Sequence, residues 1–341
     1  ANVLLGTLCG ATNVKYVDPM IGTDPVFPKN GNYAGMIPTT GSPFAMTRWT
    51  PMTFENYVGT CPYHYTEDVF HGFLATHQPA QWMGESAEIA IAPGVADVKT
   101  SYQDRGLQFS HDNEVSSPQY YKTLLETQSG YGQIVAELTA TSRAGLMRFT
   151  FPKTENPFVV VQATRSSISG EINVDPKKRE ITGWNPERQD DVLGPFTAKD
   201  FKGYFVARFD TEFTTWGTAN NATLSEGSLY GEGEEVSGYV TFDSSTEVVT
   251  VRVGVSYISI DQARVNLENE IPDDATVEET AAVVEQQWAD KLDLVQLTNA
   301  TEDDLAIFYT AMYHSLQYPS EMSEKNASGE FYYSGYDNAV H

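Results

Sequence analysis

The 341-residue sequence has few basic residues: 21 Lys and Arg stand against 46 Asp and Glu, for a formal net charge of −25 at pH 7. A surface of this charge repels nucleic-acid phosphates and anionic lipid headgroups. The shortage of basic residues therefore excludes nucleic acids and membrane surfaces as expected partners. With 40% hydrophobic and 12% aromatic residues, the chain still has the composition of an ordered globular protein.

Long apolar runs are also missing. The apolar stretch at residues 3–10 is much shorter than the roughly 20 residues that a membrane-spanning helix needs, so no transmembrane anchor is expected. The first residue is Ala1 rather than Met, which fits a mature protein whose signal peptide has been removed. Three N-glycosylation triplets, at Asn221, Asn299 and Asn326, also favour a secreted or extracellular protein.

Cysteine is scarce, with two residues in the whole chain. In a secreted protein, Cys9 and Cys61 permit one disulfide that joins the amino-terminal arm to the segment near Pro62. In a reducing compartment, the same two residues are unpaired thiols. Titration of two free thiols would contradict the disulfide.

Common catalytic signatures are absent: no nucleophile elbow, metalloprotease motif, phosphate loop or clustered cysteine site occurs. Residues 231–234 begin like a dinucleotide loop but lack its third glycine, and we expect a hairpin turn there. His64, His71 and His77 are spaced such that neither one helix face nor one strand face collects all three. The sequence therefore favours structural histidines over a metal site, and no pair of carboxylates stands out.

From about residue 86 to 260 the hydrophobic pattern has a period of two. In the clearest case, residues 249–257, valines at odd positions alternate with Thr250, Arg252 and Ser256, which predicts a half-buried strand. Turn clusters rich in Gly, Asn, Pro and Ser separate such segments. Many antiparallel strands with little helix predict a large β-sandwich.

The periodicity changes after Asp261. Apolar residues recur at spacings of three and four over 277–292, which predicts an amphipathic helix with Asp273 and Asp274 as candidate caps.

A second helix is predicted over 301–316. Thr301 stands three residues before Asp304, a variant of the capping box, and Pro319 ends the pattern. The Gly- and Tyr-rich segment 320–341 has no closing element, so we expect a chain that stops within a domain. Two amphipathic helices do not bury their own apolar stripes, and a further helical body is expected downstream or from another chain.

Several ordered blocks of sequence resemble glycoside hydrolase family 92, the calcium-dependent exo-acting α-mannosidases. The resemblance extends over about residues 16–341 and is least distinctive in the middle. The blocks that carry it include YVDPMIGTD at 16–24, PYHY at 62–65, HQPAQWMG at 77–84, RVGVSYIS at 252–259 and FYTAMYH at 308–314.

The resemblance implies a mainly β fold, a large antiparallel β-supersandwich followed by linker helices and the start of an (α/α)6 barrel. It implies an amino-terminal arm at 1–15, the β-supersandwich at 16–260, a helical linker at 261–300 and the start of a truncated catalytic barrel at 301–341. In this family the barrel carries the catalytic acid, the catalytic base and the calcium ligands. These are expected beyond residue 341, so no catalytic residue is assigned here and the metal ligands remain unknown.

The implied function is hydrolysis of terminal α-linked mannose, with α-1,2 linkages expected, from glycans with inversion. Calcium is the implied cofactor, and the partners are mannose-containing glycans and the remaining barrel. One alternative is a carbohydrate-binding β-sandwich without catalytic activity, and another is a purely structural interaction domain. Mannoside hydrolysis by this chain alone would exclude both alternatives.

The loop at 74–86 is the candidate sugar-binding element of this chain. Trp82 is expected to stack on a pyranose ring, because an indole face matches the C–H surface of a sugar. Gln78, Gln81 and Glu85 are expected to bind hydroxyls. Alternatively, Trp82 packs against the linker helices.

Two further residues, Thr23 and Asp24, follow an apolar segment and either point into the same cleft or have a local role, as a helix cap or in a turn. Residues 24–32 lack the Gly- and His-rich composition of many family members, which leaves the linkage preference open. Near the end of the chain, Tyr313 and His314 are expected to pack at the domain junction.

Overall fold

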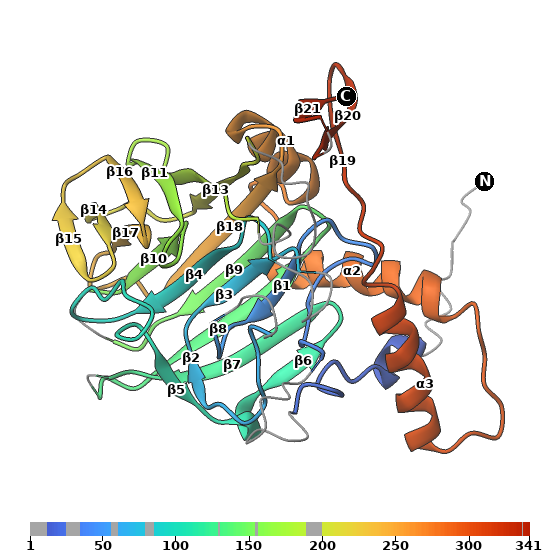
Figure 1. Ribbon diagram of the computed structural model, residues 1–341. Coiled ribbons are helices and arrows are strands. Elements are labelled where there is room, and N and C mark those ends of the chain that lie inside the picture. The colour runs from blue at the N-terminus through green and yellow to red at the C-terminus, as the bar shows by residue number, and fades with distance from the viewer. Residues whose placement is uncertain are drawn as a thin grey trace, which may run out of the picture.

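The computed structural model describes residues 12–24, 35–55, 61–78, 85–128, 130–153, 156–188, 200–335 and 337–341. The main body of this part of the chain is a pair of large antiparallel sheets that face each other, followed by helices and a short terminal sheet (Figure 1). The predicted fold class is therefore confirmed as far as the β-supersandwich and the helices that follow it.

Seven of the described strands form the first sheet. Its centre is β10, which pairs with β4 on one side and β17 on the other. In spatial order the strands are β1 (Arg48–Pro51), β3 (Phe73–Thr76), β4 (Ile89–Gly94), β10 (Phe158–Gln162), β17 (Val236–Thr241), β14 (Thr215–Asn220) and β15 (Thr223–Glu226).

Eleven of the described strands form the second sheet. In spatial order these are β16 (Tyr230–Glu234), β11 (Ser169–Asp175), β12 (Glu180–Asn185), β13 (Gly203–Phe209), β18 (Val248–Ser256), β9 (Ala144–Thr150), β8 (Gln133–Ala140), β7 (Tyr120–Glu126), β5 (Leu107–Phe109) and β2 (Val69–Phe70), with β6 (Val115–Ser117) paired to β7.

The prediction of a hairpin turn at 231–234 is wrong. These residues belong to β16, and the chain reverses one residue later, at Glu235, whose φ is 50°.

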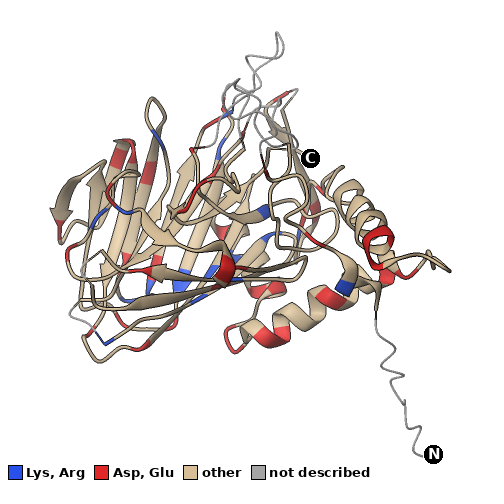
Figure 2. Cartoon of the chain, turned by 90° about the horizontal axis from the view of Figure 1, so that it is seen from below, with Lys and Arg blue, Asp and Glu red and all other residues tan. Residues whose placement is uncertain are grey.

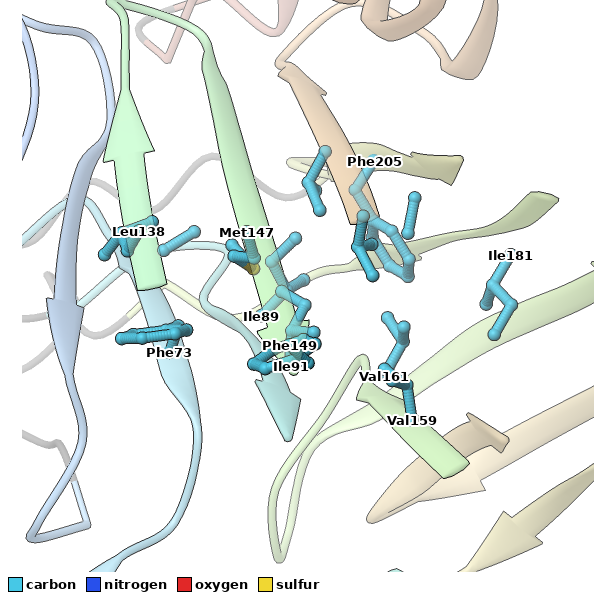
Figure 3. Close-up of a cluster of buried hydrophobic side chains, with 14 of the residues drawn as sticks. Phe73, Ile89, Ile91, Leu138, Met147, Phe149, Val159, Val161, Ile181 and Phe205 are labelled. Atoms are coloured by element: carbon cyan, nitrogen blue, oxygen red, sulfur yellow. The ribbon is translucent and has the colours of Figure 1, made fainter. Parts of the chain in front are cut away.

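The core lies between the two sheets, where side chains from both inner faces interdigitate (Figure 3). Phe73 and Ile91 come from the first sheet, whereas Leu138, Phe149 and Phe205 come from the second. All five side chains are at most 1% exposed. Burial of this kind contributes about 25 cal/mol per Å² of apolar surface, and it is the main stabilising term of the sandwich.

Close packing at one point of this core requires a glycine. A Cβ atom on Gly145 would lie 2.6 Å from the indole ring of Trp49, which is fully buried. The missing side chain on β9 therefore makes room for the largest side chain of the core.

The strand predicted at 249–257 is present as β18, but the prediction that only one of its faces is buried is wrong. Residues 251–256 are buried on both faces of β18, because helix α1 (Ile260–Glu270) packs on the outer face. A Cβ on Gly254 would lie 2.3 Å from the carbonyl oxygen of Ala263, so the helix approaches the strand backbone closely. Periodicity did not predict α1 as a separate helix, because two of its four buried residues, Gln262 and Asn266, are polar and interrupt the apolar stripe.

The two predicted helices are confirmed as α2 (Val277–Leu292) and α3 (Glu302–Ser315). The Thr301 and Asp304 capping box is present at the start of α3. At α2 the expected caps are wrong: Thr276, not Asp273 or Asp274, is the N-cap.

A second apolar cluster joins α2, α3 and the 3₁₀ turn η1 (Asn13–Tyr16). Trp288 and Tyr313 meet there with ring centroids 5.0 Å apart, and the Tyr313 hydroxyl donates to the Thr39 carbonyl at 2.6 Å. The expected packing of Tyr313 at the junction is confirmed. The buried members of this junction cluster are Val14, Val17, Val284, Trp288, Ala289, Leu292, Tyr309 and Tyr313.

The last described residues form a small sheet of β19 (Ser323–Asn326), β20 (Gly329–Ser334) and β21 (Ala339–Val340). Acidic side chains are prominent on the helices, whose first turns carry Glu or Asp (Figure 2). Across the described residues, no helix combines the length and apolarity that a bilayer crossing requires.

Candidate functional site

Two of the predicted site residues, Thr23 and Asp24, line a pocket of about 390 Å³. The pocket lies between the segment after η1 and the short 3₁₀ turn η3 (His111–Asn113). We call it the Tyr65 pocket. Its lining residues are Asp18, Met20, Ile21, Thr23, Asp24, Tyr65, His111 and Glu114.

Thr23 forms the turn that leads into the pocket. Its hydroxyl donates to the Met20 carbonyl at 2.8 Å, and its own carbonyl accepts the Tyr65 N–H at 3.1 Å. The side chain is fully buried, whereas Asp24 is exposed. The contacts of Thr23 thus match the turn alternative, and Asp24 is the residue of this pair that presents a carboxylate at the surface of the pocket.

Tyr65 provides an aromatic wall. Its ring is 41% exposed and stacks on His111, with ring centroids 4.2 Å apart. The imidazole is held in place by the Glu114 carboxylate, 2.7 Å from Nδ1, and by the Glu67 carbonyl, 3.2 Å from Nε2. Because both ring nitrogens of His111 are engaged, the stacked pair is a rigid surface with one open face.

Behind this wall, Glu114 accepts hydrogen bonds from two buried tyrosines. The Tyr63 hydroxyl lies 2.9 Å from Oε2, and the Tyr121 hydroxyl donates to Oε1. Burial, followed by the nearby Glu114 charge, raises the pKa of Tyr63 and of Tyr121, because both factors disfavour a phenolate. The tyrosines therefore remain donors and orient the carboxylate.

The sequence did not single out Tyr65, His111 or Glu114 as site residues. Tyr65 lies in the PYHY block at 62–65, which was noticed only as part of the family resemblance. His111 and Glu114 come from a segment without a motif, and the fold brings them to Tyr65 through the pairing of β2 with β5. No signal in the sequence marks that juxtaposition.

The stems of the 74–86 loop meet at Glu85. One carboxylate oxygen, Oε1, accepts the backbone N–H groups of His77 and Ser86, each at 2.8 Å, and Oε2 is bonded to the Thr76 hydroxyl. The Glu85 side chain is fully buried. Its described contacts fix the loop, and we call them the Glu85 clamp. The hydroxyl-binding role expected for Glu85 stays a prediction.

Burial raises the pKa of Glu85 to about 7, against the lowering effect of the Thr76, His77 and Ser86 hydrogen bonds, and the nearby Glu187 charge adds to the increase. Burial lowers the pKa of His77 to about 4. His77 is consequently neutral near pH 7, with Nδ1 2.8 Å from the Ser86 carbonyl and Nε2 2.7 Å from the Thr47 hydroxyl. These contacts indicate a structural role for His77 next to the Glu85 clamp.

Of the three other residues predicted in this loop, the structure describes one, Gln78. Gln78 is buried, and its backbone N–H donates to the Thr76 hydroxyl at 3.2 Å. Gln81 and Trp82 lie outside the described residues. The structure thus places Gln78 and Glu85 together in one loop and Thr23 with Asp24 in one pocket, but Gln78 and Glu85 do not line the Tyr65 pocket.

The predicted disulfide also stays a prediction, because Cys9 lies outside the described residues. Cys61 is buried, and burial raises the pKa of its thiol to about 11. The three expected glycosylation residues, Asn221, Asn299 and Asn326, are all exposed, which an acceptor requires.

The described residues hold no group of three or more His, Cys, Asp or Glu side chains with the geometry of a metal site. They therefore do not fit a calcium ion, which prefers six to eight oxygen ligands. No chemical step through calcium is derived from this part of the chain.

Comparison with known families identifies the chain. The profile described as "Glycosyl hydrolase family 92 N-terminal domain" matches residues 16–256, and the profile of the family 92 catalytic domain matches residues 262–341. The chain belongs to glycosyl hydrolase family 92, and the resemblance seen in its sequence blocks is confirmed.

Solved structures support the same assignment. The chain is similar to the inverting family 92 mannosidase BT2199 of Bacteroides thetaiotaomicron VPI-5482, with 30% identity and a TM-score of 0.87 over 97% of this chain and 43% of that one. The α-mannosidase BT3965 of the same species, solved with mannoimidazole, shares the fold at 24% identity and a TM-score of 0.80 over 97% of this chain and 43% of that one.

A curated relative, described as an uncharacterized secreted glycosidase of Arthroderma benhamiae, is 24% identical over an alignment of 343 positions that covers 92% of this chain and 42% of the relative. The chain thus spans less than half the length of the relatives that it matches.

Proposed function

We propose that this chain is the amino-terminal part of a secreted, calcium-dependent α-mannosidase that removes terminal α-1,2-linked mannose from glycans with inversion. The observation that carries the proposal is the match to both family 92 domain profiles, together with the similarity to an inverting mannosidase. The arm at 1–15, the sandwich at 16–260, the linker at 261–300 and the first barrel residues at 301–341 are its proposed parts.

In this proposal the catalytic acid, the catalytic base and the calcium ligands lie on the barrel beyond residue 341. An inverting glycosidase holds its two carboxyl groups roughly 6.5–9.5 Å apart, so that a water molecule fits between the base and the sugar. The present chain contributes walls and loops: the Tyr65 pocket and the 74–86 loop, whose stems the Glu85 clamp fixes.

The test is hydrolysis of α-1,2-mannobiose by the intact protein, with the anomer of the released mannose followed by NMR. The proposal expects β-mannose as the first product, and activity that a calcium chelator removes and added calcium restores. An intact mass far above 37.7 kDa would show that the catalytic half accompanies the described chain. Binding of glycans without cleavage by the full-length protein would instead favour the carbohydrate-binding alternative.

A variant at Trp82 tests the loop. In the intact enzyme, Trp82→Ala is expected to lower mannoside turnover roughly twofold to tenfold, since an aromatic stacking contact accounts for roughly 0.5–1.5 kcal/mol. Trp82→Phe should retain most of the activity, because it keeps an aromatic face. Equal melting temperatures would separate this effect from unfolding, and an unchanged rate for the alanine variant would refute the role.

A variant at Tyr65 tests the pocket. Tyr65→Ala is expected to raise KM for a mannoside substrate about tenfold in the intact enzyme, whereas Tyr65→Phe, which keeps the stack on His111, should leave KM nearly unchanged. Tyr131→Ala is a matched control, because Tyr131 is also 41% exposed but lies in the turn before β8. If the Tyr65 and Tyr131 alanine variants have the same KM, the pocket does not bind substrate.

A further inference from the structure

The first sheet has a free edge at β15. This strand is the last of the sheet and pairs only with β14 within the described part of the chain, so the backbone groups on its other side have no strand partner there. All four residues of β15 are exposed. The edge lies at the end of the sandwich farthest from α2 and α3 (Figure 1). These two helices therefore do not cover it.

This edge lacks the features that usually prevent one sheet edge from pairing with another. Such edges commonly carry Lys or Pro, or a covering segment. No Lys, Arg or Pro occurs over residues 209–251, and Glu226 is the one charged residue of β15. Three large apolar side chains in and after β15 are exposed: Leu224 at 41%, Leu229 at 53% and Tyr230 at 47%. An uncovered edge of this kind favours association between copies of the chain.

Asn221 is the tip of the hairpin that contains this edge. A two-residue turn that starts at Asn221 joins β14 to β15, between the paired residues Asn220 and Thr223. The φ of Asn221 is 53°, in the left-handed region that asparagine tolerates better than most residues. Its backbone N–H donates to the Glu235 carbonyl at 3.0 Å, and its carbonyl accepts the Thr100 hydroxyl. The exposed side chain has no hydrogen bond to a described residue, so the turn presents a free amide.

The other two glycosylation triplets differ from this one. At Asn326, Nδ2 donates to Gln262 Oε1 at 2.8 Å, and Oδ1 accepts the Ser328 N–H at 2.8 Å. Gln262 is 4% exposed, so a sugar on that nitrogen would have to fit beside a buried side chain. Asn299 lies between α2 and α3, away from the edge. Asn221 is therefore the acceptor whose unengaged amide lies at the free edge.

We propose that Asn221 carries an N-linked glycan and that this glycan covers the free edge of the first sheet. The oligosaccharide comes from a lipid-linked diphosphate donor. The bond between sugar C1 and the diphosphate oxygen breaks, a bond between C1 and Nδ2 of Asn221 forms, and the amide nitrogen loses one proton. The attached glycan is bulky and hydrated. It prevents a second copy of the chain from approaching β15 and the exposed Leu224 side chain.

The intact protein, secreted from an N-glycosylating yeast host, tests the modification. Release of the glycans by peptide N-glycosidase in isotopically labelled water converts each occupied asparagine into a labelled aspartate, which peptide mass spectrometry detects. We expect label at Asn221 and none at Asn326. Label at Asn326 but not at Asn221 overturns the proposal, as does the absence of label at both.

Removal of the glycan tests the covering role. Thr223→Ala destroys the triplet without changing Asn221, whereas Thr223→Ser keeps the triplet and is the matched control. The alanine variant should self-associate as its concentration rises, measured by sedimentation velocity, and the serine variant should sediment as the native protein does. Adding Leu224→Lys to Thr223→Ala should restore native sedimentation, because a lysine on an edge strand opposes pairing. Enzymatic trimming of the native glycans should reproduce the association without any substitution.

The covering role is overturned if both Thr223→Ala and the trimmed protein sediment as the native protein does. It is also overturned if Leu224→Lys fails to reverse the association, because another surface then makes the contact. The proposal rests on the secretion that is part of the proposed function, but not on mannosidase activity. An active enzyme without label at Asn221 would contradict this proposal alone, whereas a protein with a labelled Asn221 and no activity would contradict the proposed hydrolysis alone.

Discussion

Trp288→Ala is expected to lower the free energy of unfolding by about 3–5 kcal/mol, the usual cost of truncating a buried large aromatic side chain. Trp288 is 1% exposed, lies in the junction cluster between α2 and α3, and donates from Nε1 to the Gly41 carbonyl at 2.7 Å. The substitution removes the packing and leaves that carbonyl without its indole donor. Urea denaturation followed by circular dichroism measures the effect.

Two variants on the same helix serve as controls. Trp288→Phe keeps most of the ring volume and loses the hydrogen bond to Gly41, so we expect a smaller cost, about 1–2 kcal/mol. Val283→Ala changes a side chain that is 56% exposed and should alter stability by less than about 0.5 kcal/mol. If Trp288→Ala is no more destabilising than Val283→Ala, the junction does not hold the helices to the sandwich.

The second large effect is expected at Glu85, and it depends on pH. The pKa of Glu85 in the folded chain is raised to about 7, above its value of about 4.3 in an unfolded chain. The folded state therefore keeps a proton that the unfolded state releases, and this contribution to stability is complete below about pH 4 and is lost as the pH rises through 7. The loss is on the order of 3 kcal/mol.

Glu85→Gln isolates this contribution. A glutamine reproduces the protonated carboxyl, because its oxygen accepts from His77 and Ser86 while its NH₂ group donates to the Thr76 hydroxyl. Relative to the Gln variant, the native chain should therefore lose stability between about pH 4.5 and 7.5. Other groups, such as Glu187 and His77, titrate in both proteins. Where the substitution leaves their pKa values unchanged, their contributions cancel when the stability of Glu85→Gln is subtracted from that of the native chain.

Further variants complete the test. Glu85→Ala leaves the two N–H groups of the clamp without their acceptor and should cost about 2–4 kcal/mol at pH 5, where Glu85 is still protonated in the folded chain. Glu212→Gln, at an exposed position, should show no comparable pH-dependent difference. A difference between the native chain and Glu85→Gln that stays constant from pH 4.5 to 7.5 would show that Glu85 is ionised throughout.

Much of the fold could be predicted from the sequence because burial on one face leaves a periodic signal. The alternating valines of β18 and the apolar spacing of α2 are such signals, and both elements are present. The outer face of β18 was not predictable in this way, since Arg252 and Gly254 give no sign of α1, which packs against them. The reason for a glycine at position 254 is visible only in the structure, because a Cβ atom there would lie 2.3 Å from the Ala263 carbonyl oxygen of α1.

The candidate site was less accessible to sequence reasoning. Thr23 and Asp24 were selected as neighbours in the chain, but the structure assigns the turn to Thr23 and the exposed carboxylate to Asp24. Glu85 was expected at the sugar, and its described contacts lie within its own loop. A residue type states which hydrogen bonds are possible, whereas burial and partners decide which are made.

The sequence by itself determined the family, the mainly β character, the two later helices and the strong negative charge, because these follow from ordered motifs, local periodicity and composition. Only the tertiary structure decided which remote residues meet. Strand pairing brings Tyr65 to His111 and Glu114, and loop packing buries Arg105 with one unpaired N–H among the described residues. Contacts between segments distant in sequence depend on sheet order and register, and no local pattern of residues encodes them.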